Sequence, residues 1–239
     1  MTHVGIFGSA GRMGQAIVIA IESAGATHSG GIDIGEDETA LAQASDVIVD
    51  FSSPSALLAH LAAARTAKTP ILIGTTGLDD SHQAMIDDAA HDIAIIQAAN
   101  TSLGVNLLTA LIEQATARLG ADWDIEVLEM HHRHKVDAPS GTALLLGAAA
   151  AKGRGKSLPE LSRFDHDGRR DEGSIGFASL RGGSVAGDHM VILATEGERI
   201  ELGHRAEDRG IFARGAVKAA LWLADKGPGR YTMADVLGL

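Results

Sequence analysis

Short apolar runs alternate with helical patterns over the first hundred residues of this 239-residue chain. The strand-like runs occupy residues 4–7, 27–32, 47–50, 71–73 and 93–97, and the helical patterns between them occupy residues 13–23, 54–66 and 81–90. Strands that alternate with helices are joined by crossover connections, which predict a parallel sheet covered by helices. Such a sheet places its binding crevice at the carboxyl ends of its strands. We therefore expect an α/β protein with a Rossmann-type parallel sheet.

The pattern changes near residue 101, and a long amphipathic helix is predicted over residues 103–119. A strand at 124–130 and a helix at 140–152 follow, and then a polar, loop-like stretch at 153–173. Residues 175–181, 190–195 and 199–205 are predicted to form antiparallel strands, and a helix at 215–224 is expected to return to the first domain. The chain thus divides into one domain at 1–102 and 213–239 and an α+β domain at 103–212, with a mixed, largely antiparallel sheet.

Composition excludes several classes of protein. A net charge of −11 argues against nucleic acid and anionic membrane surfaces as partners. The absence of cysteine excludes disulfides, zinc–thiolate sites and thiol nucleophiles. The longest apolar stretch, residues 143–151, is too short to span a bilayer, and the N-terminus shows no signal-peptide pattern. We expect a cytoplasmic protein that binds neither nucleic acid nor membrane.

Three glycines spaced three residues apart follow the first predicted strand. Gly8 permits a tight turn, Gly11 lets the backbone approach a pyrophosphate, and Gly14 lets the next helix pack closely on the strand. The helix N-terminus then offers unpaired N–H groups to an anion. Ala10 stands where the stricter dinucleotide fingerprint has glycine. The alternative is a purely structural strand-to-helix turn, but the context favours a nucleotide site.

Asp33 ends the second predicted strand, where its carboxylate can accept hydrogen bonds from the ribose hydroxyls of a dinucleotide. The alternative is a solvated loop acid. The same charge would repel the 2′-phosphate of NADPH, and Ile34 stands where an arginine could have received that phosphate. The positive charge of nearby Arg12 reduces this repulsion of the 2′-phosphate. We therefore expect NADH to be preferred over NADPH.

Residues 131–135 place three histidines, an arginine and a lysine in succession, directly after a predicted strand. In a continued strand, His131, Arg133 and Lys135 would share one face. We weighed a metal site, a solvated structural face and a proton-donating substrate site. No carboxylate or cysteine spacing completes a set of metal ligands, so we expect no metal. An imidazole among other cations can donate and recover a proton near neutral pH, which favours the substrate site.

Residues 137–142 turn directly into the next helix. The N–H groups at its start and the Thr142 hydroxyl can hold a carboxylate. Ser140 can be read simply as the cap of that helix, and the two interpretations are compatible.

The glycine turn and the segment HHRHKVDAPSGTA at residues 131–143 together resemble the dihydrodipicolinate reductase family, and the resemblance extends over nearly the whole chain. It implies a reductase of 4-hydroxy-tetrahydrodipicolinate in lysine and diaminopimelate biosynthesis, which uses NADH or NADPH. It also implies that His131 donates or accepts a proton and that Lys135 assists as an acid. His132, Gly141 and Thr142 match positions that bind the carboxylates of a small dicarboxylate substrate.

The resemblance further implies that residues 74–76 and 98–101 contact the nicotinamide–ribose end of the cofactor, although the family usually has an aromatic residue where Thr101 stands. The expected cofactor-binding residues are Gly8, Ser9, Ala10, Gly11, Arg12, Met13, Asp33, Gly74, Thr75, Thr76, Ala98, Ala99, Asn100 and Thr101. The first domain would bind the dinucleotide, and the second would bind substrate and build a homotetramer through its sheet. A non-enzymatic dinucleotide-sensing module and an unrelated dehydrogenase are the alternatives, and neither needs the segment at 131–143.

Overall fold

The computed structural model describes residues 1–33, 35–165 and 167–239. The chain divides into two compact units, one formed by Met1–Leu103 with Gly210–Leu239 and the other by Gly104–Arg209. We predicted that the chain passes from one domain to the other after residues 102 and 212. In the structure, the boundaries between the two units fall after residues 103 and 209. No helix in the described ranges is both long and apolar enough to span a bilayer.

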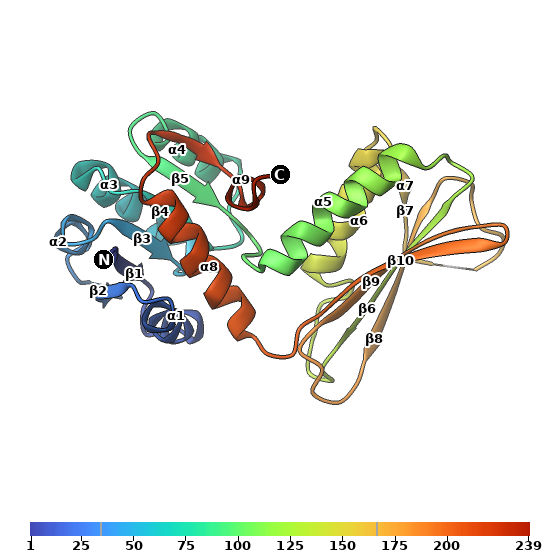
Figure 1. The fold of residues 1–239 in the computed structure, drawn as a ribbon, viewed down its shortest axis with the longest axis horizontal. Helices are drawn as coiled ribbons and strands as arrows, with labels where there is room; N and C mark the ends of the chain where they lie inside the picture. Colours follow the sequence, from blue (N-terminus) through green and yellow to red (C-terminus); the bar gives the residue numbers. More distant parts are fainter. Residues whose placement is uncertain (34, 166) are drawn as a thin grey trace. The chain divides into compact units, whose positions relative to one another are not determined.

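The first unit is built on a six-stranded parallel sheet (Figure 1). Its strands, in spatial order, are β11 (Gly229–Tyr231), β5 (Ala94–Gln97), β4 (Ile71–Ile73), β3 (Val47–Asp50), β1 (His3–Phe7) and β2 (Thr27–Ile32). The central strands β3 and β4 are buried on both faces, because helices cover both sides of the sheet. The predicted Rossmann-type sheet is confirmed.

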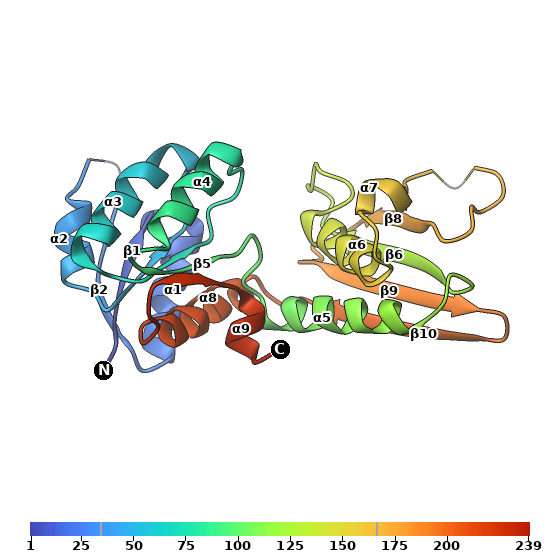
Figure 2. The same cartoon turned by 90° about the horizontal axis from the view of Figure 1, so that it is seen from above.

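Helices cover the two faces of this sheet in two groups (Figures 1 and 2). One face is covered by α1 (Arg12–Ser23), α8 (Gly210–Leu223) and α9 (Met233–Leu237). The other is covered by α2 (Glu38–Gln43), α3 (Leu57–Ala67) and α4 (Asp80–Ala89), and the 3₁₀ turn η1 (Pro54–Ala56) leads into α3. Most of the core side chains are alanine, valine, isoleucine and leucine, as the 3% aromatic content requires. Helix α8 brings the chain back to the first unit, as predicted.

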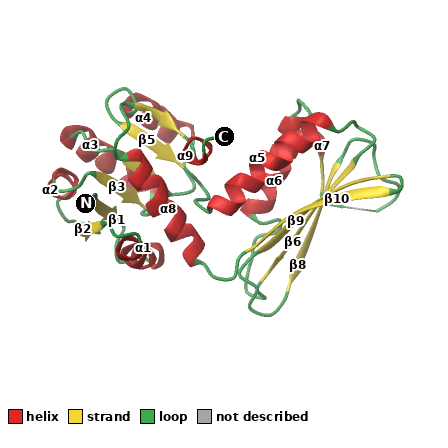
Figure 3. Ribbon diagram, viewed as in Figure 1, coloured by secondary structure: helices red, strands yellow, loops and turns green. Residues whose placement is uncertain are grey.

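The second unit is a five-stranded mixed sheet with helices on one face (Figure 3). The strands, in spatial order, are β10 (Glu198–Arg205), β9 (Asp188–Thr195), β6 (Asp124–His131), β8 (Ile175–Arg181) and β7 (Ser162–Arg163). The helices are α5 (Leu103–Arg118), α6 (Gly141–Gly153) and α7 (Leu158–Leu161). Along β6, Ile125 and Val127 point into the core under these helices, whereas Leu128 and Met130 lie on the other face, which carries no helix in the part of the chain that the structure describes.

The direction of β8 corrects one expectation. We expected residues 175–181 to pair antiparallel, but β8 runs parallel to β6, while β9 and β10 are antiparallel as predicted. The reason is the helical connection between the two strands. Helix α6 follows β6 and carries the chain back to the edge of the sheet at which β6 begins, so β8 runs in the same direction as β6, as in any βαβ unit.

Five short elements escaped prediction, namely α2, α7, β7, β11 and α9. Helix α7 and strand β7 fall in the stretch at 153–173 that we expected to be a loop. Capping signals mark the three helices: Asp37 Oδ1 accepts a hydrogen bond from Ala40 N at 2.9 Å, and capping boxes begin at Ser157 and Thr232. These signals were readable in the sequence, but the helices are too short to show a period.

Candidate functional site

The glycine turn of the first unit joins β1 to α1, and its glycines are required by close backbone contacts. Gly8 has φ +85, and a Cβ there would lie 2.6 Å from Phe51 O. A Cβ at Gly14 would lie 2.4 Å from Gly8 O. Gly11 is the cap residue of α1 and provides no side chain to its first N–H groups. The start of α1 is therefore a cradle that fits the pyrophosphate of a dinucleotide.

A cleft of about 480 Å³ opens beside this turn, between the ends of β2 and β3. Asp33 lies in it, and its Oδ2 accepts hydrogen bonds from Ala10 N at 2.8 Å and Ser9 Oγ at 3.0 Å. Glu38 adds a second carboxylate, and the described residues that line the cleft include no lysine or arginine. Ile34, singled out from the sequence as the place of an absent arginine, lies outside the described residues.

Some of the residues after β4 that we expected to bind the cofactor are instead in contact with other parts of the protein. A Cβ at Gly74 would lie 2.2 Å from the Phe51 ring, so only glycine fits there. Thr75 is buried, and its Oγ1 donates to Asp50 Oδ1 at 3.2 Å. Thr76 is exposed at the same edge of the sheet. Gly74 and Thr75 therefore shape the end of β4, and Thr76 is the member of this group with an accessible side chain.

The residues after β5 that we expected to bind the cofactor also divide into exposed residues and residues bonded within the protein. Ala99 is exposed, and Asn100 Oδ1 accepts a hydrogen bond from Ser102 N at 2.9 Å. Thr101 is 2% exposed and donates its hydroxyl to Phe212 O on α8 at 2.7 Å. Thr101, where the family usually has an aromatic residue, thus fastens this loop to α8.

Three further residues that we expected to bind the cofactor lie at the start of α1 and at the beginning of the loop after β5. Arg12 is exposed at the start of α1, and Met13 packs against the core under that helix. Ala98 is 9% exposed and belongs to the same core. The residues that the structure brings together around one cleft are Gly8, Gly11 and Asp33, with Ser9 and Ala10 bonded to Asp33.

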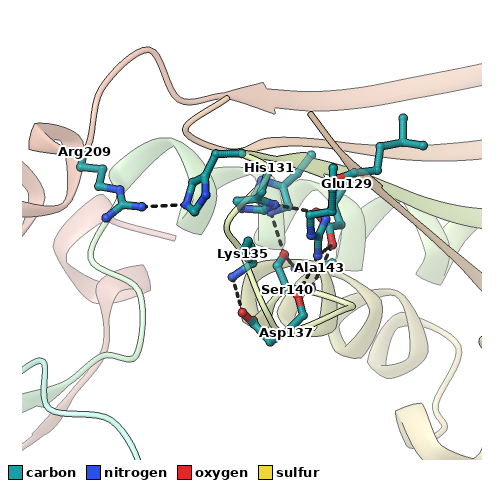
Figure 4. A network of polar contacts seen from close by, with 11 residues as sticks. Glu129, His131, Lys135, Asp137, Ser140, Ala143 and Arg209 are labelled. Carbon is teal, nitrogen blue, oxygen red and sulfur yellow. Dashed lines mark hydrogen bonds and ion pairs between the residues drawn. The ribbon is translucent and has the colours of Figure 1, made fainter. Parts of the chain in front are cut away.

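The cationic segment of the second unit is built around a buried carboxylate. Glu129 on β6 is 1% exposed, and its Oε2 lies 2.5 Å from His131 Nδ1 (Figure 4). Arg181 on β8 holds both carboxylate oxygens, each at 2.8 Å. Ser140 N, at the start of α6, donates to Oε1 at 3.2 Å. Burial alone would raise the pKa of Glu129, but the hydrogen bonds from Arg181, His131 and a further serine lower it to about 2.

A second histidine backs the first. His189 on β9 is 6% exposed, and its ring stands edge-on to that of His131, with centroids 5.1 Å apart. Its Nε2 lies 3.0 Å from Ser140 Oγ, which also caps Ala143 N at the start of α6. Burial, reinforced by the charge of His131, lowers the pKa of His189 to about 4. His189 is therefore neutral near pH 7, a value well above that pKa.

The loop after β6 presents the remaining cations. Lys135 Nζ lies 2.8 Å from Asp137 Oδ1, and His132 Nε2 lies 3.0 Å from Arg209 Nη2 (Figure 4). Burial and the neighbouring Arg209 charge lower the pKa of His132. Strand β6 ends at His131, so the alternation expected through Lys135 does not continue: His131 is buried and Arg133 is exposed.

The start of α6 offers an open anion-binding end. Ser140 caps the helix, as its sequence position suggested, and Gly141 and Thr142 are its first two residues. A Cβ built at Gly141 would meet no atom within 4 Å, so there is open space beside this first residue of the helix. The unit thus combines a helix end suited to a carboxylate with a histidine and a lysine that can supply protons. No group of three or more potential metal ligands occurs in the described ranges.

Sequence reasoning gave no role to three of these residues: Glu129, Arg181 and His189. A readable signal existed for Glu129, because it shares the buried face of β6 with Ile125, Val127 and His131 at a spacing of two. Arg181 and His189 come from β8 and β9, and their approach to Glu129 depends on strand register, which the sequence alone does not fix.

These features define a two-domain protein of the dinucleotide-binding oxidoreductase class, with a cluster of histidines and cations around a buried carboxylate in the second unit. Family models for the N-terminus and the C-terminus of dihydrodipicolinate reductase match residues 2–101 and 104–237. The chain belongs to the dihydrodipicolinate reductase family, and, like that family, it uses a pyridine nucleotide.

Relatives extend over the whole chain. A 4-hydroxy-tetrahydrodipicolinate reductase from Zymomonas mobilis is 60% identical over 99% of this chain and 97% of its own length. One from Parvibaculum lavamentivorans is 50% identical over 98% and 97%. In fold, the chain resembles a dipicolinate-bound dihydrodipicolinate reductase from Paenisporosarcina sp. TG-14, with a TM-score of 0.78, 21% identity and 98% of both chains covered.

Proposed function

We propose that this protein reduces 4-hydroxy-tetrahydrodipicolinate to tetrahydrodipicolinate with NAD(P)H, in lysine and diaminopimelate biosynthesis. Family membership supports the reaction. The observation that carries the proposal is the site of the second unit, where His131 rests on the Glu129 carboxylate beside the open start of α6. A dinucleotide-sensing module has no use for such a proton donor.

The residues divide the chemistry among them. The substrate loses water, its hydroxyl from ring carbon 4 and a proton from the neighbouring carbon, which leaves an unsaturated imine. A nicotinamide held at the first unit would supply a hydride to carbon 4 of that imine. His131 donates the proton that neutralises the electron density that develops toward the ring nitrogen, and Lys135 assists as a second acid. The N–H groups of Gly141 and Thr142, with His132, hold the substrate carboxylates. This division explains why a chain of net charge −11 concentrates cations in one short segment.

A direct assay tests the function. Purified protein is mixed with NADH, and its oxidation is followed by absorbance with and without the substrate. We expect oxidation that requires substrate and yields tetrahydrodipicolinate. Binding of NADH with no oxidation in the presence of substrate would instead support the sensing module.

We also propose that NADH is the preferred cofactor and that NADPH is accepted. Asp33 and Glu38 place two carboxylates in the cleft, and an unfavourable contact with a 2′-phosphate should be worth about 1–3 kcal/mol. We expect kcat/KM to be roughly ten- to a hundredfold higher with NADH, measured at fixed ionic strength. Asp33→Ala should narrow that ratio, and equal efficiencies in the unaltered protein would rule the proposal out.

We propose further that the protein is a cytoplasmic homotetramer assembled through the sheet of the second unit. The face of that sheet that no described helix covers carries Leu128, Met130, Leu180 and Met190 around a hollow of about 430 Å³, which Asp188, Glu201 and Arg205 also line. Leu180 is 49% exposed there, a degree of exposure that suits a residue covered by another subunit.

A further inference from the structure

Glu129 has no part in the chemistry described so far, although it is deeply buried, with 1% exposure, beside the candidate site of the second unit. Both of its oxygens are held by protein groups, and His131, two residues further along the same face of β6, is one of the partners. A buried carboxylate is costly unless every contact is satisfied, and here the contacts lead directly to the proposed acid.

We propose that Glu129, clamped by Arg181, is the positioning residue for proton transfer by His131, an inference that rests on the proposed reductase function. The 2.5 Å contact ties His131 Nδ1 to Glu129 Oε2, so the proton on Nδ1 is held and Nε2 is the atom that exchanges a proton with substrate. The same contact fixes the orientation of the imidazole ring.

Arg181 makes the position of this carboxylate rigid. Its two terminal nitrogens reach the two oxygens of Glu129 in a forked arrangement, and Nη2 also donates to Asp137 O at 2.7 Å. Ser140 N holds Oε1 from the start of α6. One carboxylate therefore connects the His131 ring, the loop that carries Lys135 and the anion-binding end of α6.

Glu129 is also the anion in contact with His131. The other charged or titratable groups that interact with His131 or with its carboxylate partner are His189 on β9, His132 in the following loop and Arg181 on β8. Lys135 and Asp137 lie further along that loop. Asp137 is paired with Lys135, and His189, with a pKa of about 4, is neutral near pH 7. Removal of the Glu129 charge therefore removes the carboxylate that contacts His131, while the Asp137 carboxylate stays paired with Lys135.

Glu129→Gln tests the proposal, because it keeps the size of the side chain and removes its charge. We expect kcat to fall roughly 10- to 100-fold while KM changes less than about threefold. The pH above which kcat/KM declines should move down by about one unit or more, because the imidazolium loses its counter-charge. Glu126→Gln is the matched control: Glu126 is on the same strand and paired with Arg170, and its loss should leave this pH profile in place.

A double variant separates a positioning role from a purely structural one. If Glu129 acts through His131, then Glu129→Gln should cost less than about twofold in a protein that already carries His131→Gln. If the fold-reduction in kcat of the double variant equals the product of the two single reductions, the proposal is overturned. A single variant that retains kcat within about twofold and keeps the pH profile would overturn it as well.

A measurement on the unaltered protein covers the case in which Glu129→Gln fails to fold. Nitrogen-15 NMR of the histidine rings reports which nitrogen of neutral His131 carries the proton. A proton on Nδ1 supports the proposal, and a proton on Nε2 overturns it. This measurement needs no turnover, so it remains decisive for the Glu129–His131 pair even if the protein fails to oxidise NADH with the proposed substrate.

Discussion

The two ring nitrogens of His131 meet different surroundings. Nδ1 is bound to the Glu129 carboxylate, whereas Nε2 faces Gly187, where a Cβ would lie only 3.0 Å away. Gly187 also has φ +155, a conformation that other residues rarely adopt. A side chain at residue 187 would therefore crowd the nitrogen that we assign to proton exchange.

Substitutions of His131, the proposed proton donor, and of Lys135, the proposed second acid, should have different effects. We expect His131→Gln to lower kcat roughly 10²- to 10⁴-fold with little change in NADH affinity, because the acid is lost and the glycine turn is untouched. Lys135→Ala should lower kcat and also weaken binding of a dicarboxylate inhibitor, because a cation of the substrate site is removed. Steady-state kinetics and calorimetric titration measure both effects. His131 is not the acid if turnover stays within about twofold.

The buried His189 should make the protein sensitive to acid. Its pKa of about 4 in the folded protein lies below the ordinary 6.5, so the unfolded chain binds a proton that the folded chain excludes. The resulting stability is full above pH 6.5 and is lost as the pH falls toward 4. We expect the free energy of unfolding to drop by about 3 kcal/mol at most across this window.

Urea titrations at several pH values across that window measure the slope, and His189→Gln should flatten it. Glu129, with a pKa lowered from 4.5 to about 2, contributes a separate loss only as the pH falls below 4.5. An unchanged slope in the His189 variant would assign the acid sensitivity to other groups.

At the level of elements, the start of α1 depends on how closely the helix meets the turn before it. A Cβ at Gly14 would lie 2.4 Å from Gly8 O and 2.5 Å from Ser9 O, so Gly14→Ala must push α1 away. We expect a stability loss of about 1–3 kcal/mol and NADH binding weakened by more than about tenfold. Thermal unfolding and fluorescence titration measure the two effects.

Gly227→Ala is the control for that substitution, because a Cβ there meets nothing within 4 Å and the backbone needs no positive φ. It should change neither quantity. Tight NADH binding by Gly14→Ala would mean that the turn tolerates a displaced helix.

Elements were predictable from the sequence where their burial pattern is strong. Strands β3 and β4 are apolar along most or all of their length, and their bounds agree with prediction. The direction of β8 was not predictable from its own residues, since it follows from the crossover through α6. The cationic segment could be singled out from the sequence as a candidate site, but the contact of Arg181 with Glu129 depends on pairing between strands far apart in sequence.

At the scale of the whole molecule, the exposed Leu180 and its apolar neighbours on the second sheet predict that subunits assemble through this face. We expect light scattering to give about four times the 24.7 kDa chain mass, and Leu180→Glu to lower it, because a charge would be buried in the interface. Ile19→Glu, on the first unit and 66% exposed, is the matched control and should leave the mass unchanged. A monomeric unaltered protein would contradict the proposed tetramer.

The division of the chain into units has a consequence for its synthesis. The first unit begins the chain but needs α8 and β11, which come after residue 209, to cover its sheet. The second unit is continuous and is complete once residue 209 has been made. On the ribosome, the domain that starts first therefore finishes last, and the core face that α8 covers stays exposed while the inserted domain folds. We therefore expect a nascent chain halted before α8 to expose this core face and to bind chaperones that recognise apolar surface.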